Sequence, residues 1–230
     1  MREKKNAIYR LFILVITVIT SLTAAKVEAG ERFFDSNGNG YNTVTKGGKV
    51  WMRDNLNVTK YRNGEEITYA ETTEEWLDAT AKGEGAWCYY NETSSKAKTY
   101  GRLYNWFAVN DPRGLAPEGW HIPSYDELKS LATALAGEPV PTGKRSPAVM
   151  TWRYPDVSVD NVMHFNAIPG GVRDTENGIF KLMNEESLLW SGSAESKTHA
   201  WAAQFNFRNS EINLNVLNKK DGASVRCVKD

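Results

Sequence analysis

Residues 200–217 read AWAAQFNFRNSEINLNVL, and this stretch decides the fold class. Its apolar side chains recur at every second position in two sets: Trp201, Ala203, Phe205 and Phe207, and then Ile212, Leu214 and Val216. A period of two is typical of a strand with one buried face. With residues 208–210, Arg-Asn-Ser, as the turn between them, the two sets predict a twisted antiparallel sheet with one face in water.

Other short β-like runs lie on both sides of this hairpin. In the C-terminal half of the chain these runs are HFNAIPGG, SLLWSGS and ASVRCVKD, and turn-forming residues separate them. Near the N-terminus ERFF, YNTV and KVWM are joined by DSNGNG and TKGG, which predicts a meander of short strands. No repeat at a fixed period and no low-complexity linker interrupts the chain, so we expect a single domain over residues 30–230.

Two helices are expected in the first half of the chain. Thr72 and Glu75 have the spacing of a capping box, and a glycine follows at position 83, which predicts a helix over residues 73–82. Ser124 and Glu127 form a second capping box. The apolar stripe that follows it comprises Tyr125, Leu128, Leu131 and Leu135.

A third helix is expected over residues 101–109, GRLYNWFAV, although this run also has the aromatic content of a strand. Strands, then two to three helices, then strands predict an α+β domain.

Residues 1–29 have the pattern of a secretory signal. Four basic residues precede an apolar run of 15 residues, positions 11–25, which is shorter than the roughly 20 residues that a membrane-spanning helix needs. Val27 and Ala29 supply a cleavage pattern that predicts removal before Gly30, with a cut after Ala25 or an uncleaved anchor as the alternatives. The expected location is the periplasm, the cell surface or the medium, with no membrane span after cleavage.

The charge of the remaining chain excludes some partners. Residues 1–29 hold five of the 28 basic and two of the 28 acidic residues, so 23 basic and 26 acidic residues remain, a net charge of −3. Nucleic-acid binding needs a concentrated basic face, and no such partner is expected.

Seven motifs in order carry a resemblance to a known family. They are DSNGNGYNTV, GKVWMRDNL, YGRLYNWFAV, APEGWHIPSYDEL, FNAIPGGVR, LWSGS and SVRCVKD. The series is similar to the Fibrobacter succinogenes major paralogous domain, a family of exported bacterial proteins, over residues 32–230. The chain departs from it at residues 189–191, Leu-Trp-Ser, where two tryptophans usually precede the serine, and it lacks the common lipid anchor. The family in turn resembles the C-type lectin-like fold of formylglycine-generating enzymes, which implies that fold here.

A calcium site is the first candidate chemistry. Asp35, Asn37, Asn39 and Gly40 match the opening of an EF-hand loop, but the twelfth position, which should be a bidentate Glu, is Lys46. We therefore interpret this stretch as a turn. No catalytic residue, metal ligand or cofactor is expected elsewhere.

Two further expectations concern single residues. Cys88 and Cys227 are the only cysteines, and in an exported domain they are expected to form a disulfide, with two buried free thiols as the alternative. Among the eight tryptophans most are expected in the core, and Trp152 is the candidate for an exposed ligand contact.

Two functions follow from these observations. The first is a non-catalytic exported domain that binds a glycan, a peptide or an envelope protein. The second, implied by the formylglycine-generating resemblance, is an oxidase that uses a close pair of C-terminal cysteines with copper. Only Cys227 lies in the C-terminal section, so binding is favoured.

Overall fold

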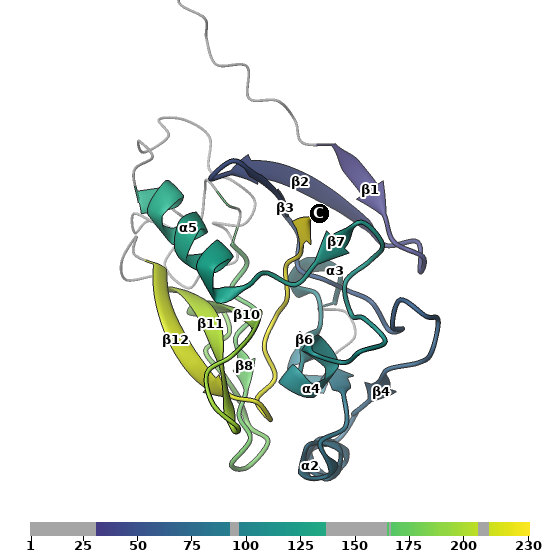
Figure 1. The fold of residues 1–230 in the computed structure, drawn as a ribbon. Helices are drawn as coiled ribbons and strands as arrows, with labels where there is room; N and C mark the ends of the chain where they lie inside the picture. Colours follow the sequence, from purple (N-terminus) through teal and green to yellow (C-terminus); the bar gives the residue numbers. More distant parts are fainter. Residues whose placement is uncertain (1–30, 93–96, 137–164, 166, 207–211) are drawn as a thin grey trace, which may run out of the picture.

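The computed structural model describes residues 31–92, 97–136, 165, 167–206 and 212–230. Its largest sheet crosses the top of the molecule in Figure 1 and brings the start and the end of this part of the chain together. In spatial order the sheet consists of β1 (Arg32–Phe34), β2 (Gly40–Lys46), β3 (Lys49–Met52), β13 (Val228–Lys229) and β7 (Trp120–His121). All of its strand pairs are antiparallel.

The predicted N-terminal meander is confirmed as β1, β2 and β3. The turn after β2 needs positive φ at two successive positions, and Gly47 and Gly48 supply φ values of 57° and 75°. Glycine adopts such angles without steric strain, which explains the tight hairpin at TKGG.

The strands predicted within residues 200–217 belong to a second antiparallel sheet. Its strands are β10 (Glu186–Ala194), β11 (His199–Asn206) and β12 (Ile212–Asn218), in that order. The expected wet face is wrong for β11, because Ala202 packs in the central cluster on one side and Ala203 packs against α5 (Tyr125–Ala136) on the other. Small alanine side chains let packed layers approach both faces. Phe207 and the turn at 208–210 lie outside the described residues.

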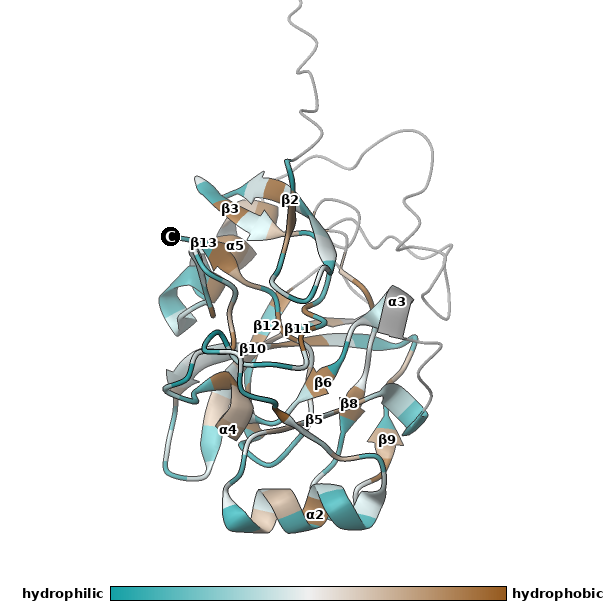
Figure 2. Cartoon of the chain, turned by 90° about the vertical axis from the view of Figure 1, so that its right-hand side faces the viewer, coloured by the Kyte–Doolittle hydropathy of each residue, from teal (hydrophilic) through white to brown (hydrophobic). Residues whose placement is uncertain are grey.

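The first predicted helix has the expected bounds. It is α2 (Thr73–Lys82), and its capping box is complete: the Glu75 amide donates to Thr72 Oγ1 over 3.2 Å, and the Thr72 amide donates to Glu75 Oε2 over 3.0 Å. Gly83 ends it in the left-handed conformation, with φ of 72°. Figure 2 shows α2 along the bottom of the molecule, with hydrophilic and hydrophobic residues alternating along it.

The expected helix over residues 101–109 is only partly correct. Its first half is a strand, β6 (Leu103–Tyr104), and only one helical turn follows, α4 (Trp106–Val109). The Asn105 side chain separates them, because its Oδ1 accepts from the amides of both Ala108 and Ala86, each over 3.0 Å. The cap that starts the helix therefore also ties it to the neighbouring strand.

The remaining elements are short. They are β4 (Thr68–Tyr69) and β5 (Ala86–Cys88), which form a sheet with β6, then η1 (Tyr90–Glu92), α3 (Ala97–Tyr100), β8 (Val172–Arg173) and β9 (Phe180–Lys181). Together these helices and sheets, in which all strand pairs except β4–β5 are antiparallel, make an α+β fold, as predicted. Among the described residues no helix is long and apolar enough to cross a membrane.

Most of the described tryptophans lie in the core, as expected. Those that are buried are Trp51, Trp76, Trp87, Trp106, Trp120 and Trp190. Trp201 is half-buried and packs on Tyr125, with 4.6 Å between the ring centroids. Trp152, the predicted ligand contact, lies outside the described residues.

Candidate functional site

The turn between β1 and β2 is organised by the Asp35 carboxylate. Its Oδ1 accepts from the amides of Asn37 and Asn39, each over 2.9 Å. Its Oδ2 accepts from the Asn39 side chain and from the Tyr41 hydroxyl, each over 2.8 Å. An ionised carboxylate has about four lone-pair sites, and these four bonds use them. The interpretation of this stretch as a turn is confirmed.

The same turn is locked to the segment after β3 by amide side chains. Asn39 Nδ2 donates to the Asn57 carbonyl over 3.1 Å, and Asn57 Nδ2 returns a bond of 3.4 Å to Asn39 Oδ1. The Asn57 amide donates to the Tyr41 hydroxyl over 3.0 Å, and the Arg102 guanidinium donates to Asn57 Oδ1. Groups that satisfy one another in this way form a rigid polar floor.

Above this floor lies a cavity of about 310 Å³, which we call the polar groove. Its lining is almost entirely polar and consists of Arg32, Asn39, Gly40, Tyr41, Asn42, Asp54, Asn55, Asn57, Thr99 and Gly101. Asp54 Oδ2 accepts from the backbone and side-chain amides of Asn42 over 2.8 and 2.9 Å. Within the described part of the chain, Asp54 Oδ1, Asn42 Oδ1 and the Arg32 guanidinium have no hydrogen-bond partner. These groups are therefore available to bond a ligand in the groove.

An exposed aromatic ring stands beside the polar groove. Phe34 is 64% exposed, and the Arg32 guanidinium carbon lies 5.2 Å from the centroid of its ring. Both side chains cross over Gly40, where a Cβ atom would come within 2.6 Å of Arg32 Nη2 and 2.8 Å of Phe34 Cε1. Only glycine leaves room for this arrangement.

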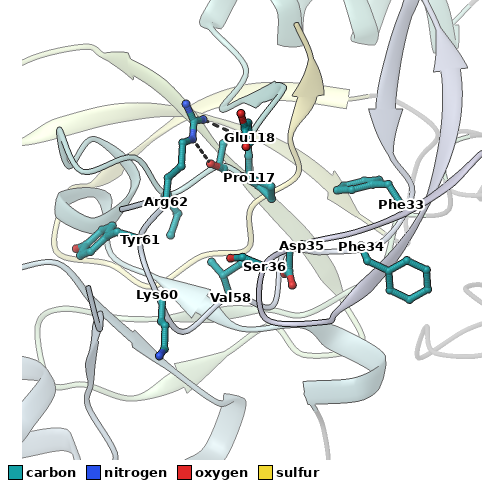
Figure 3. A pocket seen from close by; sticks show the side chains of 12 residues that line it. Phe33, Phe34, Asp35, Ser36, Val58, Lys60, Tyr61, Arg62, Pro117 and Glu118 are labelled. Carbon is teal, nitrogen blue, oxygen red and sulfur yellow. Dashed lines mark hydrogen bonds between the residues drawn. The ribbon is translucent and has the colours of Figure 1, made fainter. Parts of the chain in front are cut away.

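A second hollow, of about 320 Å³, lies on the other side of the turn (Figure 3). Phe33 forms part of its wall and stacks on Trp120, with 4.3 Å between the ring centroids. Arg62 closes the opposite wall by donating to the carbonyls of Ala116, Pro117 and Trp120 over 2.8 to 3.2 Å. Phe34 is also among the residues that line this hollow (Figure 3). Three of the N–H donors of Arg62 already bond backbone carbonyls, which leaves this guanidinium less free to bond a ligand in the hollow.

His121, which lies just before the Ser124 cap, has a structural role. Its Nδ1 lies 2.7 Å from Asp230 Oδ1 and its Nε2 lies 3.0 Å from Glu127 Oε1. Partial burial by itself lowers the pKa of His121, but the bonds to the two carboxylates outweigh burial and raise the pKa above its usual value.

Glu127 is the acceptor at the centre of this group. Its burial by itself raises the carboxyl pKa, but bonds from the Ser124 amide, Lys49 and His121 lower the pKa to about 2. Lys49 Nζ lies 2.9 Å from Glu127 Oε1. The imidazole bridges two carboxylates instead of pointing toward a nucleophile, so this cluster fastens the C-terminal end of the chain to α5.

The predicted disulfide is wrong. Cys88 and Cys227 are both free and buried. Cys88 packs against Trp76 on the α2 side of the β4–β5–β6 sheet, whereas Cys227 belongs to the cluster with Tyr104 on the other side. Burial raises the pKa of the Cys88 thiol to about 12 and also raises the pKa of Cys227. The alternative of two buried thiols is therefore correct.

Among the described residues, no group of three or more His, Cys, Asp or Glu side chains could hold a metal ion.

Sequence reasoning did not identify the polar groove, because its walls come from four separate segments. The only sequence signal was the run of Asn residues from position 37 to 57, which turn formation already explained.

The chain matches a known family. A model described as the Fibrobacter succinogenes major domain matches residues 44–229. No curated protein and no solved structure matches the chain.

Proposed function

The chain belongs to the Fibrobacter succinogenes major domain family, and we propose that it is an exported, non-catalytic domain that binds a neutral glycan in the polar groove. The observation that carries this proposal is the rigid amide floor with open polar groups above it and the exposed Phe34 ring beside it. Export rests on the signal-like pattern of residues 1–29.

Sugar hydroxyls both donate and accept hydrogen bonds, so they suit a site with both kinds of group. Asn42 Oδ1 and Asp54 Oδ1 accept, and Arg32 donates. The two bonds from Asn42 to Asp54 hold these two side chains in place before a ligand arrives, which reduces the entropy lost on binding. The Phe34 ring offers a flat surface for the apolar face of a sugar ring.

The oxidase alternative receives less support. Thiol chemistry proceeds through the thiolate, and burial raises the pKa values of Cys88 and Cys227. Their side chains also lie on different sides of a sheet, so they do not form the local pair that this chemistry uses.

The C-type lectin-like fold remains part of the proposal. It is supported by the α+β arrangement and by the capping box at Ser124, which opens α5. It concerns the fold alone, because shared folds host unrelated functions.

Binding to an array of neutral and acidic envelope glycans tests the proposed function. We expect neutral glycans to bind, and we expect Asn42→Ala and Phe34→Ala each to weaken binding of the same glycan by about fivefold, since one lost polar or stacking contact is worth about 1 kcal/mol. Thr45→Ala and Ile179→Ala are matched controls, because both residues are exposed and neither lines the groove. If no glycan binds, or if both groove variants bind as the wild type does, the proposal is wrong.

A further inference from the structure

A three-layer stack lies on the β4–β5–β6 sheet, apart from the polar groove lining. Tyr69 and Trp87 are paired across β4 and β5, and their rings stack with centroids 4.3 Å apart and planes 21° apart. The Arg102 guanidinium carbon lies 4.4 Å from the Trp87 ring centroid. Tyr89 packs edge-on against both Tyr69 and Trp87.

The inner layers of this stack are fixed. Trp87 Nε1 donates to the Ile67 carbonyl over 3.2 Å, and Arg102 donates to Asn57 and to the Tyr89 hydroxyl. Trp87 and Arg102 are both buried. Tyr69 is therefore held in one orientation by a rigid support, and no rotamer freedom has to be lost when its ring is contacted.

Tyr69 itself is open. It is 37% exposed, and its hydroxyl has no hydrogen-bond partner among the described residues. One face of the ring is occupied by Trp87, so the exposed fraction belongs to its outer face and edge. A flat, rigid aromatic face with a free hydroxyl is a stacking surface for a ring-shaped ligand.

The charge next to this surface is negative. The chain stays extended through Ala70, whose amide donates to the Trp87 carbonyl, so Glu71 emerges on the same side as Tyr69. Glu71 is exposed, and its carboxylate has no partner in the described part of the chain. The pKa of Tyr69 is raised by burial first and then by the charge of Glu71, which agrees with a carboxylate close to the phenol.

The cations near the stack do not cancel this charge at the outer face. Arg102 lies behind Trp87, two aromatic layers away from a ligand on Tyr69. Arg173 is fully buried, donates to the Ala70 carbonyl over 3.4 Å and lies 3.6 Å from Glu92, so it stands on the buried side of this segment and pairs with that second acid.

We propose that Tyr69 and Glu71 form a binding site for an amino sugar whose amine is not acylated. The apolar face of the pyranose ring lies on the outer face of Tyr69, and the ammonium group bonds the Glu71 carboxylate. An aromatic face attracts a cation, and a hydrogen bond between an ammonium group and a carboxylate is strengthened by the two charges. This site shares no lining residue with the neutral-glycan groove, where Arg32 disfavours a cationic ligand.

A nuclear magnetic resonance titration of the purified chain tests this site. The probes are the β-1,4-linked glucosamine tetramer, its fully N-acetylated counterpart, and tetralysine. The Trp87 indole N–H signal, assigned with Trp87→Phe, reports the site. We expect the glucosamine tetramer to shift this signal and to bind about tenfold more tightly than the neutral tetramer or the peptide.

Variants separate the stacking and charge contributions. Tyr69→Ala should weaken binding of the glucosamine tetramer about tenfold, Glu71→Gln about threefold, and Tyr69→Phe by less than Tyr69→Ala, because the ring remains. Glu74→Gln is the matched control, an exposed acid at the start of α2. If the neutral tetramer binds as tightly as the glucosamine tetramer, the site only stacks rings and does not select the charge. If tetralysine binds as tightly, the site binds cationic peptides, and if the Trp87 signal does not shift, there is no site at Tyr69. Each of these three results overturns the proposal and leaves the proposed function of the polar groove untested by this experiment and still open to the glycan array.

Discussion

Nε2 of His121 lies 3.0 Å from Oε1 of Glu127, and this contact connects β7 to the first turn of α5. Because the folded pKa of His121 is raised, its contribution to the free energy of unfolding is complete below the usual value of 6.5 and is lost as the pH rises through the raised pKa. Glu127 has a lowered folded pKa of about 2, so its contribution is complete above 4.5 and is lost as the pH falls toward 2.

The two contributions overlap between about pH 4.5 and 6.5, the usual pKa values of Glu and His. We expect the difference in unfolding free energy between wild type and His121→Gln to be larger at pH 5.5 than at pH 8.5, measured by urea denaturation. Salt should reduce it, because His121 is partly exposed. His199→Gln is the control, since His199 has no carboxylate partner among the described residues. An equal difference at both pH values would contradict the role assigned to His121.

The Asp35 turn should be a major local contribution to stability. Asp35→Ala removes the acceptor of four hydrogen bonds, one of them from the buried Tyr41 hydroxyl. We therefore expect the free energy of unfolding to fall by about 2–4 kcal/mol. Tyr41→Phe should cost about 1–2 kcal/mol, and Ser36→Ala, an exposed change in the same turn, less than about 0.5 kcal/mol. Denaturant unfolding measures all three. A loss under about 1 kcal/mol for Asp35→Ala would mean that water replaces these bonds.

Calcium should leave the melting temperature unchanged. The acceptor sites of Asp35 are already used by protein donors, and position twelve of the loop is Lys46. Differential scanning calorimetry with millimolar calcium and with chelator checks this. Any ligand that binds only the native state raises the melting temperature, so a rise of several degrees would reveal a site.

Both cysteines should behave as inaccessible thiols. In the folded protein neither Cys88 nor Cys227 should react with a thiol reagent within minutes, because both side chains are buried and their pKa values are raised. In denaturant without reductant, two thiols per chain should react. Reductant should not lower the melting temperature. Fewer than two reactive thiols in denaturant would restore the disulfide.

Gly171 should tolerate substitution far less than Gly119. Both have positive φ, 66° and 75°, so alanine strains the backbone to a similar extent at either position. At Gly171 an added Cβ would also lie 2.4 Å from the Lys181 carbonyl oxygen, whereas at Gly119 it meets nothing within 4 Å. We expect Gly119→Ala to cost about 1 kcal/mol and Gly171→Ala at least about 2 kcal/mol more, by denaturant unfolding. Similar losses would show that the chain around Lys181 moves aside.

Local interactions explain what the sequence could predict. The capping box of Thr72 and Glu75 predicted α2 with its observed bounds, because both partners lie within one turn. The hairpin at Gly47 and Gly48 and the turn at Asp35 depend likewise on a few neighbouring residues. Seven ordered motifs were sufficient to predict the family, because each records a local requirement of the same fold.

Expectations that depended on distant partners were less successful. The run GRLYNWFAV was split at Asn105, because its side chain bonds to Ala86, nineteen positions earlier. The alternating pattern around Ala202 predicted a strand correctly but not that packed layers cover both of its faces. The pairing of Cys88 with Cys227 failed because the β4–β5–β6 sheet stands between them.

The sequence by itself determined the α+β class, the two capped helices and the family, since each depends on periodicity or on contacts between near neighbours. Only the tertiary structure decided where a ligand could bind. The polar groove combines Arg32, Asn42, Asp54 and Asn57, and the aromatic stack joins Tyr69 to Trp87 and Arg102. Hydrogen bonding and stacking act over a few ångströms in space, so residues that are far apart in the chain form a site only after the fold has brought them together.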